Sequence, residues 1–252
     1  KLIVVALLYL FVKSIFVSTG WMRVYDVGQG DAIVFSIPDN EGFIVVDGGA
    51  NIEVDRYLSR EFTFSRCNLS LLLLTHPHYD HLRGLTRLLD RCVVDNIVHY
   101  PVDYESREYK KWSEQIRSLN VLDQTEIKIG ESKIYLLGPI VYDSTNVNNA
   151  SVIALLQYKD FDALLLGDAE VEELSSLDFN YIKKLVKGDL EVLKVAHHGA
   201  KNAYIESWPT DLIPEQCLIS VGEGNKFGHP HPEALTFYEN LGCEIRRTDI
   251  EG

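Results

Sequence analysis

The sequence predicts an α/β domain in which layers of helices and strands pack around one large core, and three observations lead to this prediction. The chain has 252 residues, of which 46% are hydrophobic and 24% are charged, which is enough for one such domain. Short apolar runs alternate along the chain with amphipathic stretches of helical period. Several apolar runs end in histidine or aspartate, which places metal-binding chemistry at the strand ends.

The net charge of −13 limits the partners that the protein can hold. It is the wrong sign for a protein that binds nucleic acid through its overall charge. It does not exclude a phosphate substrate, because divalent metals bound at a site reverse the local field. The four cysteines form no CxxC pair, so we expect small buried hydrophobic residues rather than metal ligands or disulfide partners.

The first residues form a separate apolar segment, in which Lys13 and Ser14 interrupt the run from 2 to 17. It is slightly shorter than the roughly 20 apolar residues that span a bilayer. A signal-peptide core, the end of a transmembrane helix and a buried helix all fit this pattern. Because the chain begins with lysine rather than methionine, we expect sequence upstream. We favour a membrane helix, whole or clipped, at 1–19, followed by one domain at 20–252, although Lys13 counts against a membrane helix.

Within that domain, turn residues separate the expected elements. Strands are expected at 22–27, 32–37, 42–46, 71–74, 96–99, 133–137, 151–158, 161–166, 191–196, 217–221 and 243–247. Helices are expected at 52–62, 82–89, 105–119, 170–187 and 232–241. The helix at 82–89 carries a basic face with Arg83, Arg87 and Arg91, which we interpret as solvated rather than phosphate-binding.

The segment at 71–81 is the centre of the functional prediction. Four leucines predict a strand that is buried on both faces. His76, His78, Asp80 and His81 follow directly, and all four are of metal-ligand type. We expect His76 and His78 to face one metal ion, which leaves Asp80 and His81 for a second. A polar turn that holds histidines by chance is the alternative, and the close spacing argues against it.

Further strands end in the same kinds of residue. One ends in Asp168 and another in the pair His197 and His198. Strand ends on one edge of a layered α/β sandwich share a rim, so Asp168 is our candidate for a carboxylate that bridges two metals. Two metals clamp an oxyanion and lower the pKa of a bound water, which suits hydrolysis of a phosphodiester, ester or amide. Asp47, beside two glycines, is equally expected to orient a ligand histidine or to hold the turn.

The chain resembles a known family at these positions. Residues 75–81 resemble the HxHxDH signature of the metallo-β-lactamase superfamily. Further segments resemble, in order, the C-terminal domain of ComEC-type competence proteins, and they lie at 26–32, 46–49, 148–151, 166–168, 193–199, 225–232 and 247–252. The resemblance extends from Met22 to Gly252, which is nearly the whole chain.

This resemblance implies a four-layer αββα sandwich with a dinuclear metal site on one edge, holding two divalent ions, Zn²⁺ or Mn²⁺. ComEC-type proteins are membrane channels for DNA uptake, and their metallo-β-lactamase-like domain is thought to degrade the strand that is not imported. The resemblance therefore implies a hydrolase that acts as a DNA phosphodiesterase or nuclease in competence. It also implies membrane association through the N-terminal segment, a channel domain in the same longer protein, and a catalytic domain on the extracytoplasmic side.

The family pattern also assigns roles to individual residues. It gives His76 and His78 to one metal, Asp80 and His81 to the other, and Asp168 to the bridge. A histidine of the pair at 197–198 completes the second site, and we favour His197, because it comes first off the strand, over His198.

The family pattern also bears on two further positions. Asn149 is near the position where other members place a third histidine on the first metal, and an amide there favours Mn²⁺ over Zn²⁺. His229 is a candidate general acid or phosphate contact, which with Asp80 makes two candidate catalytic residues. The alternative for His229 and His231 is a histidine- and proline-rich turn without chemistry.

The chain departs from the ComEC-type pattern at three positions. The family often has aspartate in place of His78, usually has serine in place of Ala200, and often has a small residue in place of Tyr79. Two other functions stay open. One is a small-molecule esterase, lactonase or phosphocholine esterase on the same site, which the acidic charge balance favours. The other is a metal-stabilised DNA-binding or channel-gating module without turnover. Chromogenic substrates separate the first from a nuclease, and active-site substitutions that leave function intact identify the second.

Overall fold

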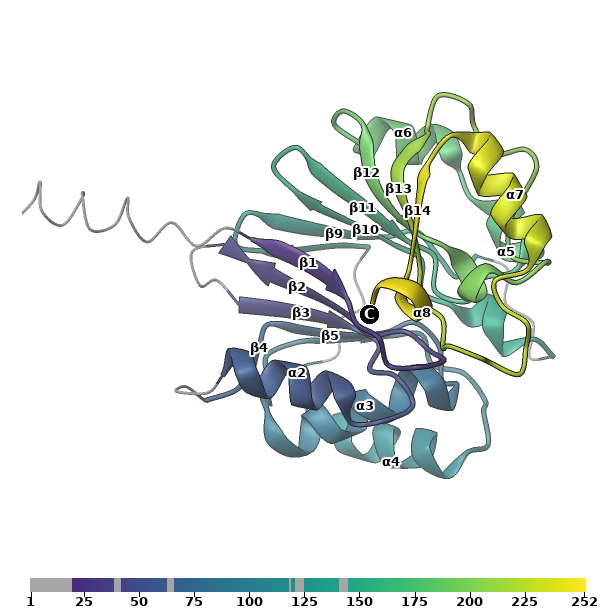
Figure 1. The fold of residues 1–252 in the computed structure, drawn as a ribbon. Coiled ribbons are helices and arrows are strands. Elements are labelled where there is room, and N and C mark those ends of the chain that lie inside the picture. The colour runs from purple at the N-terminus through teal and green to yellow at the C-terminus, as the bar shows by residue number, and fades with distance from the viewer. Residues whose placement is uncertain (1–19, 39–41, 63–65, 118, 121–124, 141–144) are drawn as a thin grey trace, which may run out of the picture.

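A computed structural model describes residues 20–38, 42–62, 66–117, 119–120, 125–140 and 145–252. Two β-sheets face each other, and helices cover the outer side of each, which gives four layers (Figure 1). Each of three clusters of buried apolar residues fills one space between layers. The predicted α/β class is therefore confirmed, and the layers follow the order helix, sheet, sheet, helix.

The first sheet has five strands in the order β1-β2-β3-β5-β7. Its strands are β1 (Trp21–Val24), β2 (Ile33–Ile37), β3 (Gly42–Val46), β5 (Leu71–Leu74) and β7 (Ile97–His99). Its covering helices are α2 (Glu53–Glu61), α3 (Tyr79–Arg91) and α4 (Arg107–Ile116). Two short strands, β4 (Asn68–Leu69) and β6 (Val93–Val94), pair separately beside it.

The second sheet has seven strands in the order β14-β13-β12-β11-β10-β9-β8. They are β8 (Glu126–Ile129), β9 (Ser132–Leu136), β10 (Ala154–Tyr158), β11 (Phe161–Leu165), β12 (Leu190–Lys194), β13 (Pro214–Ile219) and β14 (Glu244–Arg247). The helices are α5 (Val171–Ser176), α6 (Phe179–Leu185), α7 (Pro232–Leu241) and the short α8 (Thr248–Glu251), with 3₁₀ turns η2 (Val147–Ala150) and η3 (Ala196–Gly199).

The leucine strand β5 is buried on both faces, as predicted. Leu71 and Leu73 pack in the cluster between the two sheets. Leu72 and Leu74 pack in the cluster beneath the helices α2, α3 and α4. Because neighbouring side chains of a strand point to opposite faces, a strand between two apolar layers needs an uninterrupted apolar run.

Two predicted helices have different bounds in the structure. Helix α3 begins at Tyr79 rather than at residue 82, so Asp80 and His81 belong to its first turn and not to a loop. The helix predicted at 170–187 is two helices, α5 and α6. The carboxylate of Asp178 accepts a hydrogen bond from the backbone N–H of Tyr181, which starts the second helix. Strand β8 was not predicted, although its four residues alternate between charged and apolar.

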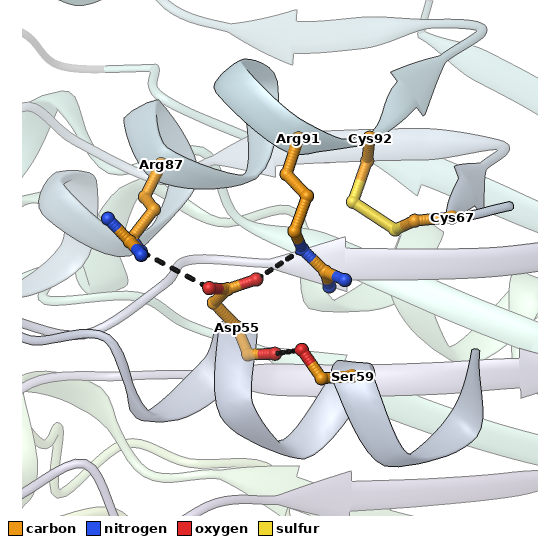
Figure 2. Close-up of a disulfide and its surroundings, with 6 residues drawn as sticks. All are labelled: Asp55, Ser59, Cys67, Arg87, Arg91 and Cys92. Atoms are coloured by element: carbon orange, nitrogen blue, oxygen red, sulfur yellow. Dashed lines mark hydrogen bonds and ion pairs between the residues drawn. A yellow bond between two sulfur atoms is a disulfide. The ribbon is translucent and has the colours of Figure 1, made fainter. Parts of the chain in front are cut away.

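The prediction of unpaired cysteines was wrong. Cys67 is joined to Cys92 by a disulfide, and so is Cys217 to Cys243 (Figure 2 shows the first). The partners are 25 and 26 residues apart in sequence. The pairing of β4 with β6, and of β13 with β14, brings them together. The spacing of the cysteines along the sequence does not indicate these disulfides, because strand pairing is what brings the partners together.

The predicted apolar helix at 1–19 lies outside the described residues. In the part of the chain that the structure does describe, no helix combines the length and the apolar character needed to cross a membrane.

Candidate metal centre

The residues predicted to bind metal come together at one edge of the two sheets. Asp47 follows β3, the histidine segment follows β5, Asp168 follows β11, and the pair at 197–198 follows β12. Strands β3 and β5 are parallel, and so are β11 and β12. The carboxyl ends of parallel neighbours lie at the same edge, which is where α/β proteins build their sites.

The carboxylate of Asp168 is the centre of this site. Its side chain is buried, and its Oδ2 atom lies within 4 Å of a nitrogen on each of four histidine rings. The distances from Oδ2 to Nε2 are 3.2 Å for His81, 3.5 Å for His198, 3.7 Å for His76 and 3.8 Å for His197. The backbone N–H of Asp168 donates to Ser151 Oγ at 3.0 Å, which holds the carboxylate in place.

Asp47 orients two of these rings at once. Its Oδ2 accepts from His81 Nδ1 at 2.8 Å and from the hydroxyl of Thr75 at 2.6 Å. Because that hydroxyl donates to Asp47, its oxygen is left to accept from His76 Nδ1, 3.1 Å away. Both rings thus carry a hydrogen on Nδ1 and turn Nε2 toward Asp168. The backbone N–H of Thr75 also donates to Asp47 Oδ1, so Asp47 holds the turn as well.

His198 is oriented in the same way from the second sheet. Its Nδ1 lies 2.7 Å from the carbonyl oxygen of Ser220, which can only accept, so Nδ1 carries the hydrogen and Nε2 faces Asp168. His197 and His198 have φ angles of 46° and 56°, which non-glycine residues seldom adopt. Backbone in this region stores strain, which is typical of functional sites.

Two more residues of the predicted set border this centre. His78 Nδ1 lies 3.0 Å from His76 Nε2. Asp80 has a carboxylate oxygen within 4.8 Å of ligand atoms of His81 and His198. His76 with His78, and Asp80 with His81, are the pairs that the sequence predicts for two metals, and the members of each pair lie close together.

The remaining predicted residues lie at the rim. Asn149 Oδ1 accepts from the backbone N–H of Glu170 at 2.9 Å, and His197 Nδ1 lies 3.4 Å from Glu170 Oε1. His229 enters from the loop before α7, with its ring centroid 5.6 Å from that of His197 and 6.2 Å from that of His198. The His231 ring lies 5.0 Å from His229.

Sequence reasoning missed a buried ion pair beneath the site. Lys194 Nζ lies 2.7 Å from Asp31 Oδ2, and both side chains are almost inaccessible to solvent. The other oxygen of Asp31 lies 3.5 Å from His198 Nδ1, so the pair supports the metal centre from below. The available signal was a lysine flanked by the apolar pairs at 192–193 and 195–196, because a buried lysine needs an anionic partner.

Burial and charge shift the pKa values of these groups in opposite directions. Burial holds the pKa of His76 well below its usual value. Burial also opposes a charge on His81, but the carboxylates of Asp168 and Asp47 outweigh it and raise the pKa of His81 well above its usual value. A cation at Nε2 would therefore take over the charge that the His81 proton supplies.

The residues of this centre fit divalent cations. Among the described residues, His81 Nε2, His198 Nε2 and Asp168 Oδ1 are buried without a hydrogen-bond partner. Asp31, Asp47, Asp80 and Asp168 bring four carboxylates together, and Lys194 is the cation paired with one of them. Buried anions need a compensating charge, and mixed imidazole and carboxylate ligands suit Zn²⁺, Mn²⁺ or iron.

The fold and this site define a metal-dependent hydrolase. The family model described as the metallo-beta-lactamase superfamily matches residues 25–208, and the chain belongs to this superfamily. The crystal structure of the metallo-beta-lactamase fold protein YhfI from Bacillus subtilis has a TM-score of 0.56 at 12% identity, and the match covers 91% of this chain and 96% of that one.

Two curated relatives match almost the whole chain. ComE operon protein 3 from Bacillus subtilis (strain 168) is 26% identical over 96% of this chain and 34% of its own length. Recombination protein 2 from Haemophilus influenzae is 25% identical over 96% of this chain and 29% of its own length. The chain thus spans about a third of the length of these relatives. The predicted resemblance to ComEC-type competence proteins is confirmed.

Proposed function

We propose that this chain is the metallo-β-lactamase-like domain of a ComEC-type protein and that it hydrolyses DNA phosphodiesters with two divalent metals. The observation that carries the proposal is the Asp168 carboxylate, which lies among four histidines with three further carboxylates nearby. Similarity to ComE operon protein 3 supports DNA as the substrate and competence as the process.

Each metal has its own set of ligands in this proposal. His76 and His78 hold the first, because their nitrogens converge to 3.0 Å. Asp80 and His81 hold the second together with His198, whose Nε2 lies with them, whereas His197 directs Nδ1 to Glu170. Asp168, whose Oδ2 lies near Nε2 of His76, His81 and His198, would serve both metals. When bound, two metals polarise the phosphodiester and lower the pKa of a bound water.

His229 completes the reaction site as a substrate contact. Burial, with further contributions from neighbouring histidines, lowers the pKa of its ring to about 4. A ring that is neutral at pH 7 donates one hydrogen bond to a phosphate oxygen more readily than it gives a proton to a leaving group. Asn149 supports the rim through its bond to Glu170, so the protein ligands of the first metal would be His76, His78 and the shared Asp168.

The two disulfides support a place outside the cytoplasm, because disulfides persist in oxidising compartments. We propose an extracytoplasmic domain, attached to the membrane through residues 1–19 and joined to a competence channel domain in one longer protein. A membrane-impermeant maleimide should label the four cysteines of the denatured protein only after reduction. Labelling without a reductant would contradict this placement.

Metal-dependent degradation of single-stranded DNA tests the activity. With Mn²⁺, Mg²⁺ or Zn²⁺ supplied in turn, we expect loss of an end-labelled strand. Loss of a residue that only orients a ligand lowers activity about 10- to 100-fold. Asp80→Ala and Asp168→Ala should each lower the rate of cleavage by more than this. Asp160→Ala, an exposed aspartate next to β11, is the matched control and should keep its activity.

Two outcomes would contradict the proposal. Turnover of chromogenic esters or lactones without cleavage of DNA would identify a small-molecule hydrolase. Absence of turnover on every substrate, with metals that still stabilise the fold, would identify a binding module.

A further inference from the structure

A cavity of about 690 Å³ lies between α3 and α4, next to the metal centre. We name it the arginine–tyrosine groove after the side chains that line it and carry a positive charge or an aromatic ring. These are Tyr79, Arg83, Arg87, Tyr104, Arg107 and Lys111.

The groove opens onto the candidate ligands through its two tyrosines. Tyr79 lies in the chain between His78 and Asp80, and its side chain is 50% exposed. The Tyr104 ring meets the His78 ring edge to face, with 5.6 Å between their centroids. A molecule in the groove is therefore adjacent to the first metal position.

The charge of the groove is opposite to that of the protein. Four cations and the carboxylates of Asp90 and Glu108 line it, in a chain whose net charge is −13. Asp90 pairs with Lys111, and Glu108 accepts from Thr86. Across the residues that the structure describes, Arg83 and Arg107 are in no ion pair, so both guanidinium groups can serve a ligand.

The three arginines of α3 therefore have different roles. Arg87 and Arg91 both reach Asp55 on α2, which ties the two helices together (Figure 2). Arg83 instead lies over the ring of Tyr79, with its Cζ atom 5.2 Å from the ring centroid. The interpretation of this face as merely solvated misses that Arg83 lies over the ring of Tyr79, which follows the candidate ligand His78 in the chain.

We propose that the arginine–tyrosine groove binds a single strand of nucleic acid and leads it to the metal centre, an inference that rests on the proposed phosphodiesterase function. Cations along a groove neutralise phosphates, and aromatic or guanidinium planes stack on bases. The bases of a duplex are stacked on each other, whereas those of a single strand are free to stack on Tyr79. A small ester requires neither the two guanidinium groups of Arg83 and Arg107 nor an exposed aromatic surface.

Binding without cleavage tests the groove. Fluorescence anisotropy with a labelled oligo-dT strand in EDTA measures the affinity of the full chain at several salt concentrations. Arg83→Ala combined with Arg107→Ala should weaken binding at least about tenfold at low salt and reduce the slope of log K against log salt by about 1.4. Equal affinity and slope in this double variant and in the unchanged protein would overturn the proposal.

Matched variants separate the groove from general charge. Lys110→Ala with Arg117→Ala removes two exposed cations near α4 that do not line the groove, and affinity should stay within about twofold. A loss equal to that of the groove variant would overturn the proposal. Tyr79→Ala should weaken binding about 5- to 150-fold, and Tyr79→Phe should restore it because the ring is kept. Equal affinity of Ala and Phe at this position would contradict stacking.

The activity assay distinguishes failure of the groove from failure of the proposed function. Bis(p-nitrophenyl) phosphate reports on the metal centre with a substrate too small to follow the groove. The groove variant should lose more of its rate on the oligonucleotide than on this small diester, and equal losses would overturn the groove. If the unchanged protein hydrolyses neither substrate, the proposed function fails, while the anisotropy experiment still decides whether the groove binds a strand.

Discussion

The metal centre and the arginine–tyrosine groove lie side by side, yet they differ in charge and burial. The metal centre is acidic and largely buried, and hydrogen bonds fix its side chains. The groove is basic and open, and its arginines are exposed. Buried charges cost several kcal/mol when a partner is removed, whereas exposed charges cost little. Substitutions in the centre should therefore change stability and chemistry, and those in the groove should change affinity.

The largest effect on stability is expected at the ion pair under the metal centre. Lys194→Met leaves the buried carboxylate of Asp31 without its cation and should lower the free energy of unfolding by about 3–5 kcal/mol. Urea unfolding measures this, and adding Asp31→Asn should recover part of the loss. Lys128→Met, an exposed lysine in β8, should change stability by less than about 0.5 kcal/mol. Similar losses in both lysine variants would remove the distinction between buried and exposed charge.

Metal loading should stabilise the centre without any substitution. Mn²⁺ or Zn²⁺ at 100 times its dissociation constant adds about 2.7 kcal/mol, which raises the Tm of a domain of this size by about 5–10 °C. Differential scanning fluorimetry with and without a chelator measures the shift. Asp168→Ala should show a much smaller one, and an undiminished shift in this variant would mean that the stabilising metal binds elsewhere.

Asp47→Asn should weaken metal binding about 10- to 100-fold, because Asp47 sets the orientation of His81 and, through Thr75, of His76. Asparagine tolerates the φ angle of 57° at this position, so the turn is kept. Competition with a chromogenic chelator measures the affinity, with the exposed Asp95→Asn as control. Unchanged affinity would show that Asp47 only holds the turn.

The smallest effect is expected at the contact between α2 and α3. Asp55→Asn weakens the bonds to Arg87 and Arg91 and should cost about 0.5–1 kcal/mol (Figure 2). Because it releases Arg87 to the groove, binding of the oligonucleotide should become tighter while stability falls. A parallel loss of affinity would mean that the groove needs Arg87 in its present position.

In the first half of the chain, the sequence predicted which elements form better than it predicted where they begin and end. The run at 71–74 and the ligands behind it were found because both signals are local. The start of α3 at Tyr79 was missed because the histidines and the aspartate conceal the helical period. The disulfides and the role of Asp31 were missed because their partners come from distant strands.

The sequence by itself determined the α/β class, the buried leucine strand and the types of metal ligand, because these depend on residue chemistry and short-range periodicity. The tertiary structure decided which ligands share a site, since parallel strand ends meet at one edge regardless of their separation in sequence. It also decided that Asp47 orients two histidines, and that α3 and α4 together form a basic groove in an acidic protein. Such properties arise from distances between side chains that only packing fixes.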